Sequence, residues 1–482
     1  MKEKLREAIS EVEESGATYA DARFLCRKRQ NIETRNDKVE AFNEETSQGI
    51  GIRVLYNGSW GFAGTNKADE KSILDTAKRA LRLARAASRV KVLDVVLSEA
   101  PTVKDSYETE CRIDPFSVPV ERKIETLLNC DAVMAEQEGV TVREGSFQAF
   151  HEEKDFISTE GSDIHQKITY CGAGISATAS SDTENQVRSY PASFGGDYAT
   201  RGYEFIEEME LEKHAKRIAE EAVQLLKAPQ CPEEKTTLLL GGSQLALQIH
   251  ESCGHPIELD RAMGMEASFA GTSFLTPDKR CNFQYGSELV NMYGDSTVKG
   301  GLGTFGYDDE GIPAQVFDIV KKGEFVNYLT SRETAVLFEE KSNGTVRADG
   351  WERMPMIRMT NVNLKPDDWK LDELIKDTEK GIMTETNRSW SIDQQRLNFQ
   401  FGTEIAYKIE DGSVEGIYKN PTYTGITYEF WRSVDAITNK DDWRLWGIPN
   451  CGKGEPMQTM YVGHGCSTVR FRNVHIGVGE WE

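Results

Sequence analysis

The segment HESCGHP, His250–Pro256, contains residue types that can hold a metal ion and use it. In the usual H-E-x-x-H motif, two histidines four residues apart lie on one helix face and bind zinc, and the glutamate acts as general base. Here His250 and His255 are five residues apart. On a straight α-helix this step leaves the two imidazoles about 140° apart and roughly 7.5 Å apart along the axis. A straight helix therefore cannot present both rings to one ion.

Gly254 and Pro256 offer a way around this obstacle. Glycine readily takes the left-handed conformation at a helix end, and proline commonly follows a helix stop. We therefore expect the helix to end, or to widen by one residue, between Cys253 and His255. The broken turn would bring His255 beside His250, and Glu251 could then act as general base. The alternative is a capped helix end that carries two surface histidines.

A catalytic zinc site usually has three protein ligands and one water, so two histidines are not enough. The candidates for the third ligand are two thiols, two carboxylates and one imidazole: Cys451, Cys466, Glu258, Asp260 and His464. A cysteine in a glycine-flanked turn is the most ligand-like, because the backbone there can bend to present sulfur. Taken singly, each of these residues is more often structural, so spacing alone leaves the choice open.

The segment GLGTFG, residues 301–306, matches the G-x-G-x-x-G pattern of dinucleotide sites. In those sites a helix begins directly after the glycines, whereas the acidic segment YDDEG follows here. The pattern therefore predicts a flexible, acid-flanked loop and not a nucleotide site.

Composition excludes several classes of function. The chain has 57 basic and 79 acidic residues, a net charge of −22, and no block of lysine and arginine, which argues against a nucleic-acid partner. No apolar run approaches the roughly 20 residues that span a membrane. The polar N-terminal segment lacks an apolar signal core, so we expect a cytoplasmic protein. Nine cysteines without a C-x-x-C pair are expected to be mostly free and buried.

The order of patterns predicts an α+β fold of two domains. Helical spacing over residues 2–15, 70–88 and 204–228 alternates with strand patterns, including a hairpin at Asn57–Gly58 and strands over 140–180. We expect an N-terminal domain, 1–228, with helices packed on an antiparallel sheet. The proline-containing segment Ala228–Lys235 would link it to a strand-rich antiparallel C-terminal domain, 236–482. In that domain a strand over 236–240, an N-cap at Ser243 and a helix would lead into the metal motif.

Several segments together resemble the TldD/PmbA family of zinc metallopeptidases. They are LQIHESCGHPIELD, GTFGYDDEGIP, MPMIRMTNVNL, FGTEIAYKIEDGSV and the C-terminal stretch from NCGKGEP to the last strands. The resemblance covers most of the chain and is most specific over residues 236–482.

The resemblance implies His250, His255 and Cys451 as Zn²⁺ ligands and Glu251 as catalytic base. Cys466 matches a position that the family does not use for metal. His464 departs from the usual VGVG pattern, because this chain reads VGHG, so its role stays open. The family's noncatalytic branch lacks the H-E-x-x-x-H triplet, and this chain, which keeps it, is similar to the catalytic branch.

The same resemblance implies a zinc-dependent metallopeptidase that cleaves unfolded or extended peptides, as a homodimer or as a heterodimer with a noncatalytic paralogue. Two alternatives remain: a noncatalytic subunit that presents peptide, and another zinc hydrolase with deformylase-like chemistry. Glu258 or Asp260 could orient an imidazole, and a strand edge could bind the peptide. Candidate oxyanion stabilisers are Arg358, Tyr461 and His464.

Overall fold

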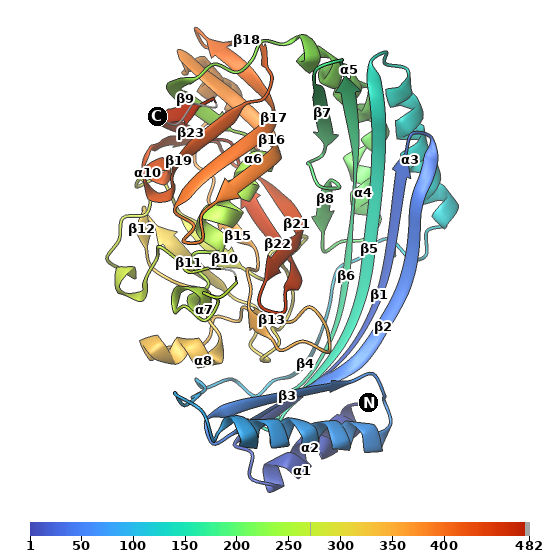
Figure 1. Ribbon diagram of the computed structural model, residues 1–482, viewed down its shortest axis with the longest axis vertical. Helices are drawn as coiled ribbons and strands as arrows, with labels where there is room; N and C mark the ends of the chain where they lie inside the picture. Colours follow the sequence, from blue (N-terminus) through green and yellow to red (C-terminus); the bar gives the residue numbers. More distant parts are fainter. Residues whose placement is uncertain (270, 478–482) are drawn as a thin grey trace.

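The computed structural model describes residues 1–269 and 271–477, so the last five residues of the predicted C-terminal domain lie outside it. Two large sheets with flanking helices confirm the expected α+β class (Figure 1). Each sheet draws its strands from one half of the chain. How the chain divides into domains stays a prediction.

The first half forms an eight-stranded sheet in the order β3-β2-β1-β5-β6-β4, with β7 and β8 also paired to β6. All neighbours are antiparallel except β4 and β6. The strands are β1 Tyr19–Arg35, β2 Lys38–Tyr56, β3 Ser59–Thr65, β4 Lys104–Glu108, β5 Val140–Ser158, β6 Asp163–Ser180, β7 Asn185–Tyr190 and β8 Asp197–Ala199. The helices are α1 Lys2–Glu14, α2 Glu70–Ala87, α3 Val120–Ala135, α4 Glu204–Met209 and α5 Leu211–Lys227.

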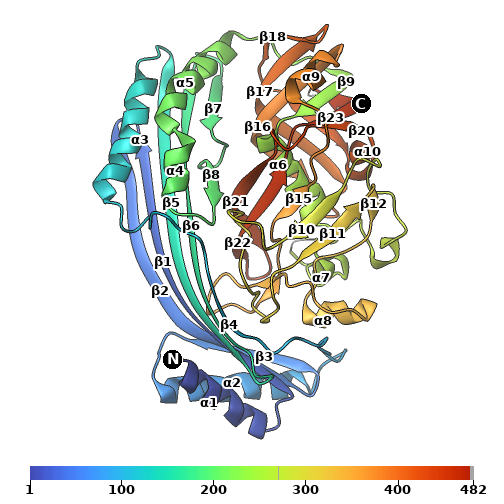
Figure 2. The ribbon, with the colours of Figure 1, turned by 180° about the vertical axis from the view of Figure 1, so that it is seen from behind.

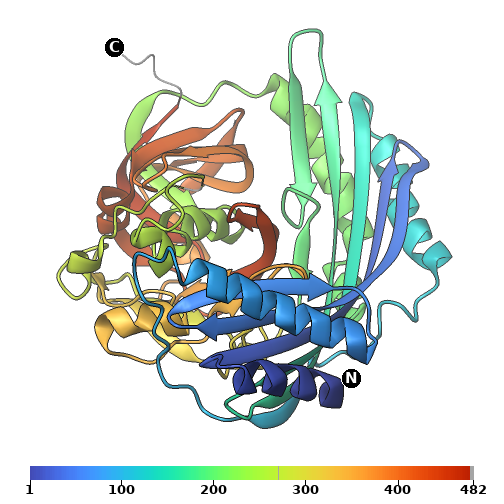
Figure 3. The ribbon, with the colours of Figure 1, turned by 60° about the horizontal axis from the view of Figure 1, so that its bottom comes forward.

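Successive side chains along the strands of this sheet point to opposite faces, and both faces are covered by other parts of the molecule. On β5, Ala149 packs in the cluster under α3 and α5, whereas the next residue, Phe150, points to the other face and joins Tyr461 of the second half. On β6, Cys171 and Tyr170 divide in the same way. Figure 2 shows the long curved strands with α3 at one end, and Figure 3 shows α1 and α2 across the other.

The second half contains a seven-stranded sheet in the order β16-β9-β23-β19-β17-β18, with β20 on β23. An additional pairing of β16 with β17 closes a ring of five strands. The pairing of β9 with β16 is parallel, which the antiparallel expectation missed. The strands of this sheet are β9 Glu234–Leu240, β16 Lys380–Ile392, β17 Asn398–Glu410, β18 Ser413–Tyr418, β19 Thr422–Ile426, β20 Val434–Ile437 and β23 Val469–Ile476.

Smaller sheets and short helices complete this half. β12-β11-β10-β15, β13-β14 and β21-β22 form separate sheets. These strands are β10 Met292–Asp295, β11 Val316–Lys321, β12 Glu324–Phe325, β13 Val346–Arg347, β14 Met356–Ile357, β15 Val362–Leu364, β21 Arg444–Lys453 and β22 Gln458–Cys466. The α-helices are α6 Gly242–Ile249, α7 Leu259–Ala262, α8 Arg332–Ala335, α9 Leu371–Lys376 and α10 Thr427–Arg432. No helix in the described ranges is long and apolar enough to cross a membrane.

Local turn chemistry confirms some predicted elements and corrects others. Asn57 and Gly58 have φ of 43° and 67° and join β2 to β3, as the hairpin signal predicts. The helix predicted over 204–228 is broken at Glu210, whose φ is 48°. Ser243 does not cap α6: Gly241 precedes the helix, and the Ser243 hydroxyl accepts a bond from a strand backbone instead.

The segment 301–306 is a loop, as the sequence indicates, but it is largely buried. A Cβ on Gly303 would lie 2.3 Å from the carbonyl oxygen of Thr360, so this glycine permits a close approach between two backbones. The acidic residues that follow lie between the two halves of the molecule.

Buried ion pairs join these acidic residues to the first sheet. The Asp309 carboxylate lies 2.6 Å from Lys154 Nζ of β5 and 3.3 Å from an Arg23 nitrogen of β1. Arg53 of β2 pairs in the same way with Glu310, at 3.4 Å. Both partners of each pair are buried, so separating the two halves would break these ion pairs. It would also expose the apolar cluster that the halves share.

We expect Asp309→Ala to lower the free energy of unfolding by about 3–5 kcal/mol, because it leaves two buried cations without their carboxylate. Urea unfolding followed by fluorescence measures the change. Lys299→Ala, which breaks the exposed Lys299–Glu110 pair, should change it by less than about 0.5 kcal/mol. Equal effects for the two variants would contradict this account of the interface.

Candidate metal centre

The motif HESCG forms a π-helical turn, His250–Gly254, directly after α6. The amide of His255 donates to the carbonyl of His250, five residues earlier, at 3.1 Å. The predicted widening by one residue is therefore confirmed, and it places the two imidazoles with their ring centres 4.8 Å apart.

Gly254 contributes through its size and not through a left-handed conformation. Its φ is not positive, unlike that of the glycines in the tight turns. A Cβ at this position would lie 2.1 Å from the sulfur of Met359. The widened turn therefore packs against the core where only a hydrogen atom fits.

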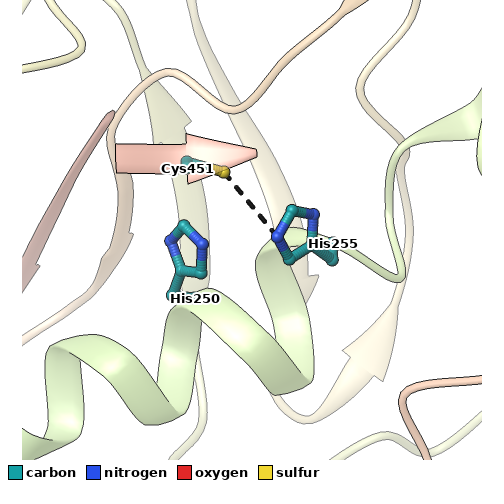
Figure 4. Close-up of side chains that lie close together, drawn as sticks. All are labelled: His250, His255 and Cys451. Carbon is teal, nitrogen blue, oxygen red and sulfur yellow. Dashed lines mark hydrogen bonds between the residues drawn. The ribbon is translucent and has the colours of Figure 1, made fainter. Parts of the chain in front are cut away.

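Cys451 reaches this turn from β21. The pairing of β21 with β22 shifts register between Ile448 and Cys451, which is a β-bulge of the kind that re-aims side chains. The thiol lies 3.7 Å from His255 Nε2 (Figure 4). The candidate ligand atoms of His250, His255 and Cys451 all lie within 4.8 Å of one another, and all three residues are buried.

A carboxylate behind the site orients His255. Glu258, fully buried, accepts from His255 Nδ1 at 3.0 Å, which leaves Nε2 facing Cys451. Asp260, the other candidate from the sequence, instead pairs with Lys453 at 2.7 and 2.8 Å. Burial would raise the pKa of Glu258, but Lys453 and His255 bring it well below its usual value, so the carboxylate stays ionised.

A metal binds a thiolate or a neutral imidazole, and the surroundings shift Cys451 and His250 toward these forms. Burial would raise the pKa of the Cys451 thiol, but Arg358 and His255 outweigh this and place it below its usual value. Burial lowers the pKa of His250 to about 4, so this ring is neutral near pH 7. Cys466 contrasts with Cys451, because burial holds its pKa well above the usual value and its thiol donates to the Gly242 carbonyl.

Glu251 faces the same site and pairs with Arg396, a residue that the sequence did not single out. Burial would raise the pKa of Glu251, but Arg396, with His255 and His250, lowers it below its usual value. Arg396 lies in the turn between β16 and β17, with a φ of 65°. No local motif marks this turn, because its partner is 145 residues away in the chain.

A cavity of about 250 Å³ opens beside these groups. Its lining contains the three candidate ligands and the Glu251–Arg396 pair, together with apolar side chains from distant segments: Phe194, Leu247, Trp390, Trp446, Ile448 and Pro449. Trp390, from the β16 segment RSWS, is one of these lining residues.

The three candidate oxyanion stabilisers do not line this cavity. Arg358 is fully buried and donates to the backbone carbonyls of Cys451 and Gln458. The Tyr461 hydroxyl accepts from Arg29 in the contact between the two halves. His464 contacts His250, with its Nε2 2.9 Å from His250 Nδ1, and is not among the three candidate ligands.

Fold and site together define an α+β protein with a buried centre that could hold one metal ion. The domains described for PmbA/TldA metallopeptidases match successive parts of the chain: domain 1 over 20–84, the central domain over 113–226 and the C-terminal domain over 233–478. The chain belongs to the PmbA/TldD family.

Relatives of known name agree with this assignment. A protein of Methanocaldococcus jannaschii named as a metalloprotease is 30% identical over 94% of this chain and 95% of its own length. One of Methanothermobacter thermautotrophicus, also named as a metalloprotease, is 31% identical over 96% of each chain. A metalloprotease TldD homolog of Haemophilus influenzae is 25% identical over 95% of this chain and 92% of its own.

Solved structures share the whole fold. A crystal structure from Thermotoga maritima matches with a TM-score of 0.78 at 18% identity, covering 99% of this chain and 100% of the other. TldE from Thermococcus kodakarensis matches with a TM-score of 0.73 at 16% identity, covering 98% and 100%. At these identities the likeness concerns the fold alone.

We expect Cys451→Ala to weaken the binding of Zn²⁺ or Co²⁺ by more than the 10–100-fold that is typical when a group supporting a ligand is lost. Competition with a chelating dye measures the affinity. Cys466→Ala removes an equally buried thiol that bonds to a backbone carbonyl, and it should bind metal as the unaltered protein does. If both variants lose metal equally, the ligand assignment is wrong.

Proposed function

We propose that this chain is a zinc-dependent metallopeptidase that cleaves unfolded or extended peptides. The observation that carries the proposal is the buried group of His250, His255 and Cys451 with Glu251 in the same cavity. The metalloprotease names of its relatives support the class of activity.

Zinc suits this donor set because it prefers nitrogen and sulfur ligands in a roughly tetrahedral arrangement, and catalytic zinc sites have three protein ligands. His250, His255 and Cys451 would hold it and leave a position open. When bound there, zinc lowers the pKa of water and polarises a peptide carbonyl. Burial lowers the pKa of His250 to about 4, so this ring is neutral near pH 7. Burial would raise the pKa of the Cys451 thiol, but Arg358 and His255 lower it, which favours the form that binds a metal.

Glu251 is the general base of this proposal. Its carboxylate is ionised beside Arg396, so it can take a proton from water and deliver it to the leaving amine. Arg396 orients the carboxylate through this pair. Its guanidinium also lines the cavity, where it offers further N–H donors to the carbonyl oxygens of a peptide.

An extended peptide fits the surroundings better than a folded protein does. β21 pairs with β22 in a two-stranded sheet, which leaves its other edge outside that sheet, and its residues from Ile448 to Gly452 line the cavity. A peptide could add to this edge as a further strand and be read mainly through its backbone. The three candidate ligands are buried in this cavity of about 250 Å³, which a folded chain would not enter.

We also propose that the protein works as a dimer, either with itself or with a noncatalytic paralogue. TldE, the fold neighbour from Thermococcus kodakarensis, supports the second arrangement. A cytoplasmic location remains part of the proposal, supported by nine cysteines that are all free.

We expect Glu251→Gln to keep its metal and to lose about 10²–10⁴-fold in kcat, because general acid–base catalysis contributes that much. The assay uses a quenched fluorescent peptide without stable structure. Glu429→Gln, at an exposed position on α10, should keep full activity.

Full activity in Glu251→Gln would remove the general base from the proposal. Mass spectrometry of the products distinguishes internal peptide cleavage from loss of a formyl group. A metal-loaded protein that cleaves no peptide, alone or with its paralogue, would support a presenting subunit instead.

The cavity rim predicts a preference for peptides with a large apolar side chain near the scissile bond. Phe194 and Trp390 are in edge-to-face contact at 5.3 Å and are 50% and 43% exposed. Phe194 also has a φ of 59°, which is costly for a bulky residue and typical of functional positions.

We expect Trp390→Ala to lower kcat/KM about 10-fold or more for a phenylalanine-containing peptide and little for its glycine counterpart, because apolar pocket contacts discriminate by this amount. Paired peptides measured side by side test this. Phe42→Ala, which removes an exposed aromatic on β2, should leave the ratio unchanged. An unchanged ratio in Trp390→Ala would contradict the rim as a subsite.

A further inference from the structure

His464 is fully buried on β22, and both of its ring nitrogens have a defined partner. Its Nε2 lies 2.9 Å from His250 Nδ1, and its Nδ1 lies 2.9 Å from the carbonyl oxygen of Val362. His464 is not part of the candidate ligand group, which consists of His250, His255 and Cys451. Among the described residues, its hydrogen bond to the candidate ligand group is the one to His250.

The two contacts determine where the protons are. A carbonyl oxygen can only accept, so His464 Nδ1 must carry the hydrogen in the bond to Val362. In a neutral imidazole the other nitrogen, Nε2, is then an acceptor. The bond between the rings is therefore donated by His250 Nδ1. This leaves a lone pair on His250 Nε2, the nitrogen that remains for a metal.

The last acceptor in this chain of bonds, the Val362 carbonyl, belongs to a strand of a sheet. Val362 begins β15, which pairs with β10. On either side of His464, the Gly463 amide donates to Thr360 at 3.1 Å and the Gly465 amide donates to Asn363 at 2.6 Å. The backbone on both sides of His464 is therefore hydrogen-bonded to the segment that contains Val362, the residue whose carbonyl accepts from the imidazole.

His255 also needs an acceptor for its Nδ1 hydrogen if Nε2 is to face the metal. Its acceptor is the Glu258 carboxylate, at 3.0 Å. The two imidazoles are therefore oriented by different acceptors, one charged and one neutral. A carboxylate acceptor raises the basicity of a histidine ligand more than a neutral group does. The site is consequently asymmetric, with His255 as the more basic ligand.

We propose that His464 is a positioning residue that fixes the tautomer and the orientation of His250, so that Nε2 of His250 faces the metal. The inference rests on the proposed metal site, but the arrangement of protons exists in the metal-free protein and is tested there.

The direct test is ¹⁵N NMR of the metal-free protein labelled at its histidine rings. Proton–nitrogen correlations distinguish the two neutral tautomers, and the spectrum of His464→Gln assigns the coupled pair of rings. We expect hydrogen on Nδ1 of both His250 and His464. Hydrogen on Nε2 of His250 in the unaltered protein would overturn the proposal.

The second test is metal affinity, measured with Zn²⁺ and Co²⁺ against a chelating dye. His464→Leu removes the acceptor and should raise the dissociation constant 10–100-fold, the usual effect of losing such a support. His464→Gln keeps an amide oxygen that can accept from His250, and it should recover part of this loss. The control is His475→Leu, at an exposed position on β23, which should bind as the unaltered protein does.

Unchanged affinity in His464→Leu, or an equal loss in the leucine and glutamine variants, would overturn the proposal. Should the leucine variant fail to fold, the tautomer measurement on the unaltered protein decides alone. A protein that binds no metal at all would refute the proposed function, whereas the tautomers of the two rings would still be observed.

Discussion

The bond from the His255 amide to the His250 carbonyl is the constraint on which the site depends. A bond to the residue four positions earlier would continue the α-helix and leave the two imidazoles about 140° apart. The extra residue in the turn instead brings the two ring centres within 4.8 Å, in an edge-to-face arrangement. Glu251, the next residue after His250, lines the cavity from the same turn. The tight packing of Gly254 against Met359 holds this turn in the core.

One strand supplies both a candidate ligand and the charge that the site needs. Cys451 and Lys453 are two residues apart on β21, so both side chains leave the same face of the strand. Lys453 lies 2.7 Å from Asp260 and 3.6 Å from Glu258. Buried carboxylates are costly unless they are paired, so this lysine allows Glu258 to remain ionised behind His255. The CGK sequence thus supplies the Cys451 thiol and, at Lys453, the positive charge that stabilises the carboxylates of Glu258 and Asp260.

Local patterns in the sequence predicted the hairpin at Asn57–Gly58, the α+β class and the widened turn, because each depends on residues close together in the chain. Glu258 was foreseen as an orienting group for the same reason, since it is three residues from His255. Arg396 and Lys453 could not be foreseen, because their partners are brought together only by the closed ring of strands and by β21. The burial of segment 301–306 was missed because it arises from contact with Thr360, far along the sequence.

The first half of the chain is part of the site even though the candidate ligands all lie in the second. Asp197 of β8, fully buried, accepts from the amide of Gly447 at 2.8 Å and from Arg444 at 2.9 Å, so it holds the strand that carries Cys451. The neighbouring segment places Phe194 at the cavity rim. The second half contains the three donors, but the alignment of β21 and the shape of the cavity depend on contacts across the interface. The buried ion pairs between the halves therefore stabilise the surroundings of the candidate site as well as the fold.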